Sequence, residues 1–187
     1  MTNKIFEVRF HGRGGQGAWT ASLLLAQAGL AEEKYIQSFP AFGPERAGAP
    51  ITAFTRISEE KIQLHSSIYE PDVVVVLDPT LLGPSVSEGV KKDTILIVNT
   101  EKSAEDVLET LGLEDLETWT VDATTLAIDI LGRPITNTAM LGSVVKSTGI
   151  VKLESIVEAV KERFPGKIGE ANADLIKKAY DEVKKNE

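Results

Sequence analysis

The sequence predicts a three-layer α/β fold with a largely parallel sheet, one β-hairpin and a helical C-terminus. Three observations support this prediction: short apolar segments typical of strands covered on both faces, apolar residues at helical spacing, and a glycine-rich turn between the first strand and the first helix. The length of 187 residues is that of one domain, at about 150 residues per domain. We therefore expect residues 1–187 to form a single domain.

The N-terminal segments are expected to alternate between strands and a helix. Residues 5–10 form a first predicted strand, residues 18–31 an Ala- and Leu-rich helix, and residues 35–39 a second strand. Residues 39–50 contain three Pro and two Gly, which predicts a loop.

The middle of the chain is expected to supply the hairpin and the central strands. Residues 51–57 and 61–66 alternate apolar and polar side chains, which predicts an antiparallel hairpin. Residues 72–78 and 94–99 are almost continuously apolar, as expected for buried parallel strands.

The second half of the chain is predicted to be mainly helical. Ser103 followed by Asp106 indicates a helix start, and residues 117–121 predict one more strand. Further helices are expected from apolar residues at helical spacing, at 124–131, 138–148, 153–164 and 171–183.

The distribution of charge directs the search for a ligand. The formal net charge of −8 argues against nucleic-acid binding, which needs a basic surface. Residues 1–56 carry six basic and four acidic side chains, whereas residues 57–149 carry six and sixteen. An anionic ligand is therefore expected in the first segment, which also contains most of the glycine-rich sequence.

Three absences exclude further classes. A chain without cysteine forms no disulfide and holds no iron–sulfur cluster on thiolates, and two histidines argue against a multi-histidine metal site. Neither a membrane-spanning run nor the apolar core of a signal peptide is present, so we expect a cytoplasmic protein without membrane contact.

The glycine-rich turn is the strongest candidate site. It fits the pattern G-x-G-x-x-G between a predicted strand and a predicted helix, where free backbone N–H groups and the helix dipole attract an anion such as pyrophosphate. The alternative is a tight turn in which the glycines serve packing alone. The candidate residues are Gly12, Arg13, Gly14, Gly15, Gln16 and Gly17.

A dinucleotide is not the ligand that this turn predicts. That class expects a carboxylate for the ribose about 20 residues further on, where this chain has Gln37 and Ser38. Arg13 and Arg46 instead suggest a ligand with additional phosphate. Glu45 and Arg46 lie in the loop at residues 39–50, where they either contact the ligand or form a solvated surface pair.

Other polar residues have two possible roles. His11 either contacts a phosphate or is held by a hydrogen bond at the strand end, and His65 is interpreted as structural. Asp72, Asp78 and Asp122 border predicted strands, where they cap the strand ends or act in catalysis, and capping is the commoner role. No nucleophile with a neighbouring base is recognisable, so we assign no catalytic residue and no metal ligand.

Three segments of the first half resemble the gamma subunit of pyruvate:ferredoxin oxidoreductase and its relatives that act on other 2-oxoacids. They read VRFHGRGGQGA, YIQSFPAFGPERAGAPITAFTRI and IYEPDVVVVLDPTLL. The resemblance continues through IVNTEKS, VDATTLA and PITNTAMLG and covers essentially the whole chain. Many members have two basic residues before GAP, where this chain has Arg46 followed by Ala47, so no contact is assigned to position 47.

The resemblance implies a subunit of a cytoplasmic heterotetramer with alpha, beta and delta partners. Such an enzyme converts a 2-oxoacid and coenzyme A to an acyl-CoA and carbon dioxide and passes two electrons to ferredoxin. It holds thiamine diphosphate between alpha and beta and iron–sulfur clusters on beta and delta, which leaves no cofactor on this chain. Coenzyme A enters after decarboxylation, and the resemblance assigns its binding to residues 12–17 and to Glu45, Arg46 and Asn137.

Several alternatives remain open at this point. Pyruvate is the first choice of substrate, ahead of a branched-chain 2-oxoacid or 2-oxoglutarate. A stand-alone nucleotide-binding domain is disfavoured by Gln37 and Ser38. In a purely structural subunit, the glycine turn would be an interface turn without a ligand.

Overall fold

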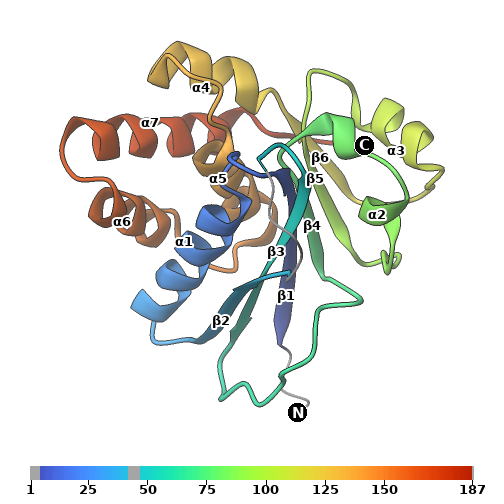
Figure 1. Ribbon diagram of the computed structural model, residues 1–187, viewed down its shortest axis with the longest axis horizontal. Helices are drawn as coiled ribbons and strands as arrows, with labels where there is room; N and C mark the ends of the chain where they lie inside the picture. Colours follow the sequence, from blue (N-terminus) through green and yellow to red (C-terminus); the bar gives the residue numbers. More distant parts are fainter. Residues whose placement is uncertain (1–4, 42–46, 187) are drawn as a thin grey trace.

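A mixed sheet with helices on both faces forms the centre of the molecule (Figure 1). The computed structural model describes residues 5–41 and 47–186, and within them the sheet has seven strands in the order β2-β3-β1-β4-β5-β6-β7. The strands are β1 (Phe6–Arg13), β2 (Tyr35–Pro40), β3 (Pro50–Ser58), β4 (Val73–Val76), β5 (Ile95–Asn99), β6 (Thr118–Val121) and β7 (Lys184–Lys185).

Helices connect these strands and form the C-terminal region. Between β4 and β5 lie two short helical turns, η1 (Pro79–Leu81) and α2 (Pro84–Ser87). The longer helices are α1 (Ala18–Ala31), α3 (Ala104–Leu111), α4 (Ala123–Leu131), α5 (Asn137–Thr148), α6 (Leu153–Arg163) and α7 (Lys167–Glu182).

The predicted α/β class is confirmed, with one correction to the hairpin. Strands β1, β4, β5 and β6 are mutually parallel, whereas β3 runs antiparallel to both of its neighbours, β1 and β2. The hairpin is therefore β2–β3, and the prediction that residues 61–66 form its second strand is wrong. Because β1 and β2 already occupy both edges of β3, residues 61–66 have no edge to pair with and form an irregular segment.

The remaining predicted elements are found within a few residues of their expected bounds. The capping box at Ser103 and Asp106 is present, and α7 begins earlier than expected, after Gly166 with a φ of 71°. The sequence analysis did not predict η1, α2 or β7, which are only two to four residues long.

The two faces of the sheet are covered differently. Helices α1 and α4–α7 cover one face, and α2 and α3 lie on the other (Figure 1). Alternation along β1 directs Val8 and Phe10 into the α1 side, where both side chains are fully buried, and Arg9 and His11 to the opposite face. Near β1 and β3, the irregular segment 59–72 lies against that opposite face in place of a helix.

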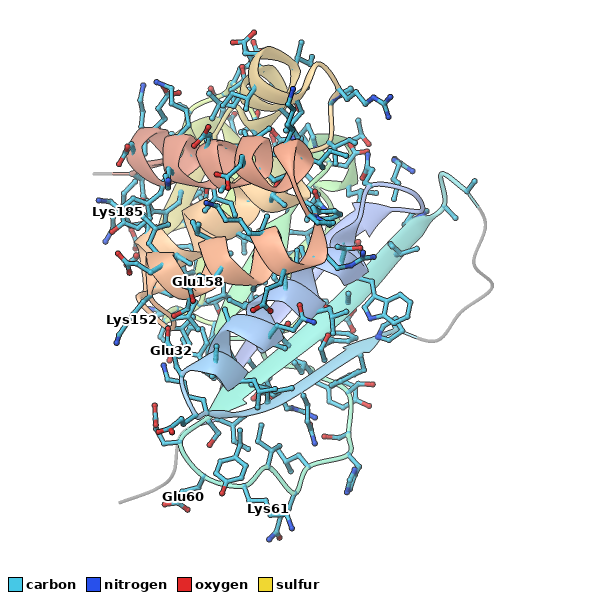
Figure 2. The ribbon with its side chains drawn as sticks, turned by 90° about the vertical axis from the view of Figure 1, so that its left-hand side faces the viewer. Glu32, Glu60, Lys61, Lys152, Glu158 and Lys185 are labelled. Atoms are coloured by element: carbon cyan, nitrogen blue, oxygen red, sulfur yellow. The ribbon has the colours of Figure 1, made fainter. Side chains whose placement is uncertain are left out.

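Contacts between distant segments close the helical layer. Figure 2 shows Glu32, after α1, beside Lys152, before α6, and the carboxylate of Glu32 accepts a hydrogen bond of 2.6 Å from the backbone N–H of Lys152. Within the described ranges, no helix is long and apolar enough to cross a membrane.

Candidate functional site

Three glycines of the turn between β1 and α1 are required by the local geometry. Gly15 and Gly17 have φ angles of 96° and 81°, in a backbone region that residues with a Cβ rarely adopt. A Cβ on Gly12 would lie 3.1 Å from the Cβ of Ala18, so this glycine allows the strand and the helix to approach closely.

Backbone hydrogen bonds tie the turn to the segment that leads into β3. The N–H of Gly14 donates to the carbonyl of Ala49 at 2.9 Å, and the N–H of Gly48 donates to the carbonyl of Gly14 at 3.1 Å. The side-chain oxygen of Gln16 accepts from the N–H of Arg13 at 2.7 Å. The N–H groups of Arg13 and Gly14 are thus used within the protein.

The side chain of Arg13 is held by neighbouring protein groups. Its Nε lies 3.1 Å from Oδ2 of Asp78, and its terminal nitrogens donate to the hydroxyl of Thr80 at 2.8 Å and to the carbonyl of Gly48 at 3.2 Å. Gln16 donates to the same Asp78 oxygen at 2.8 Å. Asp78 therefore compensates the charge of Arg13, and the arginine orders the turn.

Asp78 is ionised in this arrangement. Burial raises the pKa of Asp78, but the hydrogen bonds from Thr80 and Gln16 and the nearby Arg13 outweigh it, so the pKa is below its ordinary value. The sequence analysis interpreted Asp78 as a possible cap, and it caps η1 through the N–H of Thr80. Its cluster with Arg13 was not predicted, because the residues are 65 positions apart.

The start of α1 offers backbone donors. No side chain caps the helix, and its first hydrogen bond is from the N–H of Ala21 to the carbonyl of Gly17. The N–H groups of Ala18, Trp19 and Thr20 find no acceptor in the part of the chain that the structure describes. An uncapped helix start of this kind favours an anion.

A second helix begins at the same place. Asn137, the first residue of α5 and nearly fully buried, lies so close to Gly17 that a Cβ there would be 2.5 Å from its Nδ2. The structure thereby brings Asn137 to the glycine turn, and the coenzyme A contact that the resemblance implies for it stays a prediction. The positive ends of two helix dipoles meet at this point.

An open hollow of about 510 Å³ adjoins the turn, a volume within the range of small-molecule sites. The Trp19 side chain forms part of its wall and is 50% exposed. The lining residues are Gly14, Gly15, Gly17, Ala18, Trp19, Thr20, Ala47 and Ile51. Backbone donors and one aromatic face are therefore available to the same ligand.

Gln37 and Ser38 do not line this hollow. Gln37 donates to the carbonyl of Leu64 at 2.9 Å, and the hydroxyl of Ser38 lies 3.0 Å from the hydroxyl of Ser22, so both are used inside the fold. Glu45 and Arg46 lie outside the described residues.

The histidine and aspartate alternatives are resolved in different ways. His11 lines a separate hollow on the far face of the sheet and not the hollow at the glycine turn, and its Nε2 has no hydrogen-bond partner among the described residues, so the hydrogen bond expected at the strand end is not found on that nitrogen. Asp122 caps α4 through the N–H of Thr125, and Asp72 accepts from the N–H of Glu7. Both aspartates bond to backbone N–H groups, as the capping interpretation expected.

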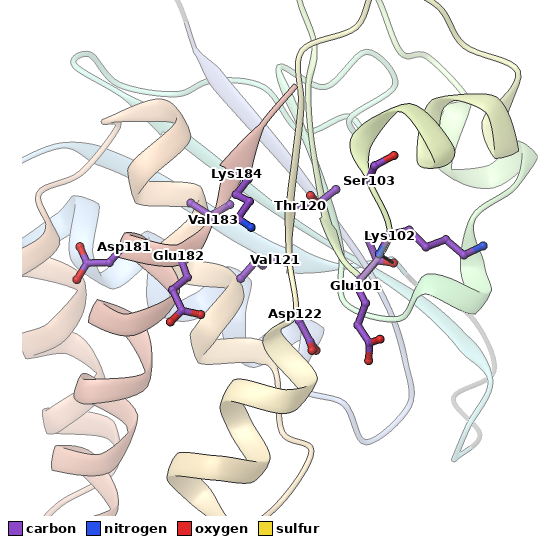
Figure 3. Close-up of a pocket in the computed structure, with 11 residues that line it drawn as sticks. Glu101, Lys102, Ser103, Thr120, Val121, Asp122, Asp181, Glu182, Val183 and Lys184 are labelled. Carbon is purple, nitrogen blue, oxygen red and sulfur yellow. Dashed lines mark hydrogen bonds between the residues drawn. The ribbon is translucent and has the colours of Figure 1, made fainter. Parts of the chain in front are cut away.

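A hollow of about 680 Å³, larger than the one at the glycine turn, lies at the carboxyl ends of β5 and β6 (Figure 3). Four carboxylates and two lysines line it, which disfavours an anionic ligand. The charged residues are Glu101, Lys102, Asp122, Asp181, Glu182 and Lys184. Among the described residues, His, Asp and Glu side chains do not gather in a group of three that could hold a metal ion.

The fold and the turn define a class of protein: an α/β domain in which a glycine turn joins the first strand to an uncapped helix start. A model of the family described as pyruvate ferredoxin/flavodoxin oxidoreductase matches residues 7–182. The chain belongs to this family, and within it to the gamma subunits.

Relatives from archaea and bacteria are similar over nearly their whole length. The Pyrococcus furiosus protein named pyruvate/ketoisovalerate oxidoreductases common subunit gamma is 58% identical over 96% of this chain and 97% of its own. The crystal structure of the Thermotoga maritima pyruvate oxidoreductase subunit PORC (EC 1.2.7.1) is 45% identical, with a TM-score of 0.90 over 98% of this chain and 99% of that one.

A more distant structure shares the fold within a longer chain. It is the 2-oxoglutarate:ferredoxin oxidoreductase of Magnetococcus marinus with 2-oxoglutarate, coenzyme A and succinyl-CoA bound, at 17% identity and a TM-score of 0.73. The match covers 94% of this chain and 30% of that chain.

Proposed function

We propose that this chain is the gamma subunit of a pyruvate:ferredoxin oxidoreductase and that its glycine turn binds coenzyme A. The enzyme would convert pyruvate, coenzyme A and oxidised ferredoxin to acetyl-CoA, carbon dioxide and reduced ferredoxin. The observation that carries the coenzyme A role is the hollow beside the uncapped start of α1, which the glycine turn and Trp19 line.

The residues at the turn have different roles in this proposal. The backbone N–H groups at the start of α1 would hold phosphate oxygens, and Asn137 would contribute its amide. Gly15 and Gly17 let the backbone approach the ligand, while Arg13 and Gln16 keep the turn in shape through Asp78. Gly12 allows close packing of β1 against α1, and the backbone of Gly14 forms hydrogen bonds with Ala49 and Gly48.

The chain itself supplies binding and assembly. A chain without cysteine cannot hold an iron–sulfur cluster on thiolates, so we place the clusters and thiamine diphosphate on alpha, beta and delta partners of a cytoplasmic heterotetramer. Ferredoxin would take electrons from the complex without a redox centre in this chain.

The choice of pyruvate rests on two relatives. The Thermotoga protein is named for pyruvate alone, and the Pyrococcus protein is named as common to pyruvate and ketoisovalerate oxidoreductases. The second name favours one alternative, in which this chain also serves a branched-chain 2-oxoacid enzyme. Purification of the chain with its partners and mass identification of each alpha subunit would distinguish one enzyme from two.

A matched pair of glycine variants in the assembled enzyme tests the coenzyme A role. Gly15 and Gly112 both have positive φ and open space where an alanine methyl group would lie, but only Gly15 lines the hollow. We expect Gly15→Ala to raise the KM for coenzyme A about ten-fold and Gly112→Ala to leave it unchanged. Reduction of the clusters by pyruvate without coenzyme A should be normal in both, because coenzyme A enters later.

Two outcomes would contradict the coenzyme A role. If assembled Gly15→Ala enzyme has the KM of Gly112→Ala enzyme, the glycines serve packing alone and the proposal fails. Loss of cluster reduction by pyruvate would place the effect on the first half-reaction and would also contradict it.

A further inference from the structure

A second hollow, of about 490 Å³, lies on the opposite face of the sheet, where β1 and β3 run side by side. Arg9 and His11 project into this face from β1, opposite Phe54 and Thr52 of β3. Ile68, in the segment that precedes β4, lines another side of the hollow. Nothing in the glycine turn contributes to it.

Two buried nitrogens at this hollow have no hydrogen-bond partner in the part of the chain that the structure describes. Arg9 and His11 are each only 5% exposed, and Nε of Arg9 and Nε2 of His11 have no hydrogen-bond partner among the described residues. A buried polar atom without a partner costs about 1–3 kcal/mol. Two such atoms on neighbouring side chains of one strand face indicate a partner that the described residues do not supply.

The hydrogen bonds of Arg9 leave this donor free. One terminal nitrogen of its guanidinium donates to the carbonyls of Val86 and Glu88, at 2.9 and 2.7 Å. These bonds fix the plane of the guanidinium and occupy both hydrogens of that nitrogen. Nε remains as a charged donor in a fixed direction.

Arg9 supplies the positive charge at the base of the hollow, and the exposed Glu88 interacts with it electrostatically. Arg9 is buried, whereas the lining carboxylates Glu70 and Glu88 are less buried, and Glu70 pairs with Lys91 at 2.5 Å. Neutral His11 can donate from Nε2 to the same oxyanion. The side chains of Phe54 and Ile68 supply an apolar wall.

We propose that the hollow formed by Arg9, His11, Phe54 and Ile68 binds a small organic anion, a carboxylate or phosphate with a short apolar body. The oxyanion would accept hydrogen bonds from Nε of Arg9 and Nε2 of His11, and the apolar body would contact Phe54 and Ile68. This site is distinct from the glycine turn and does not depend on the coenzyme A proposal.

Nuclear magnetic resonance of this 187-residue chain tests this directly, because the chain has only two histidines, His11 and His65. The probes are acetate, isobutyrate and inorganic phosphate, titrated at neutral pH and constant ionic strength. We expect a saturable shift of Nε2 of His11 and Nε–H of Arg9, with His65, which lines a different hollow, unaffected. Tighter binding of isobutyrate than acetate would identify a carboxylate ligand, and tighter binding of phosphate a phosphate ligand.

Two variants distinguish binding in this hollow from nonspecific binding of anions elsewhere on the chain. His11→Phe keeps an aromatic ring without the nitrogens and should weaken binding, followed at Arg9, by at least about ten-fold. His65→Gln is the matched control and should bind as the unmodified chain does.

Three results would overturn the proposal. They are the absence of a saturable shift with all three probes, unchanged affinity in folded His11→Phe protein, and loss of binding in the assembled oxidoreductase. The last would show that a partner chain covers or fills the hollow.

Discussion

At the scale of single residues, Trp19 is the side chain best placed to add affinity for a nucleotide-bearing ligand. It is half-exposed beside the uncapped start of α1. Stacking of a base on an aromatic ring contributes about 1–3 kcal/mol. We expect Trp19→Ala to raise the KM for coenzyme A by about five- to 150-fold and Trp19→Phe to restore most of the loss. Steady-state kinetics of the assembled enzyme measures both, and equal KM values in the two variants would remove stacking from the account.

A second residue-scale prediction concerns the buried pair of Arg56 and Glu7. Arg56 is 1% exposed and its Nε donates to Glu7 at 2.7 Å, while its other nitrogens contact Gln37 and the carbonyl of Ser67. Removing one partner of a buried pair costs about 3–5 kcal/mol. Because Glu7 is partly exposed, we expect Arg56→Met to lower the free energy of unfolding by about 3 kcal/mol, the lower end of this range.

Urea denaturation of the isolated chain measures this loss. The double variant Glu7→Gln, Arg56→Met should lose less than the sum of the two single variants, since it leaves neither charge unpaired. Additive losses would show that the two side chains are independent.

At the scale of secondary structure, the contact between α5 and α7 depends on one glycine. A Cβ on Gly142 would overlap the carbonyl oxygen of Ile176, so the helices must separate in Gly142→Ala. We expect a loss of about 3 kcal/mol or more in the free energy of unfolding. Gly149→Ala is the control, because its site is open and only its positive φ is strained, for about 1–2 kcal/mol. Similar losses in thermal denaturation would contradict close packing at Gly142.

The strands and helices differ in how well the sequence could predict them. Continuous apolar runs predicted β4 and β5, and the Ser103 capping box predicted α3, because these signals are local. The partner of β3 was mispredicted because pairing depends on which edges other strands already occupy.

Long-range contacts explain the rest of the candidate site. The glycine turn was found from its spacing, but Asn137 came only from the family resemblance, since it is 120 positions from Gly17. The pairing of Arg13 with Asp78 likewise had no local signal, so the sequence analysis did not predict it; the phosphate contact of Arg13 stays a prediction. The orphaned nitrogens of Arg9 and His11 are visible only once the sheet is formed.

At the scale of the whole molecule, stability should depend on pH through His11. Burial, followed by the neighbouring Arg9, lowers the pKa of His11 to about 4 from 6.5. Between these values the unfolded chain binds a proton that the folded chain does not, so stability falls as pH falls from 6.5 to about 4. The full loss corresponds to about 3 kcal/mol.

Denaturation across this pH range provides the measurement. His11→Phe should flatten the decrease, whereas His65→Gln, at an exposed position, should retain it. Asp78, whose pKa is lowered, loses its contribution only at more acidic pH, as the carboxylate becomes protonated. A decrease of the same size in His11→Phe protein would assign the effect to other groups.

The central claim is that the glycine turn is the coenzyme A contact of this subunit. Hydrogen–deuterium exchange of the assembled oxidoreductase, with and without coenzyme A, tests it most directly. We predict slower exchange for the backbone N–H groups of residues 15–20 when coenzyme A is present, with no change at the capping box of α3. Protection absent from residues 15–20 at saturating coenzyme A, or confined to other subunits, would contradict the account.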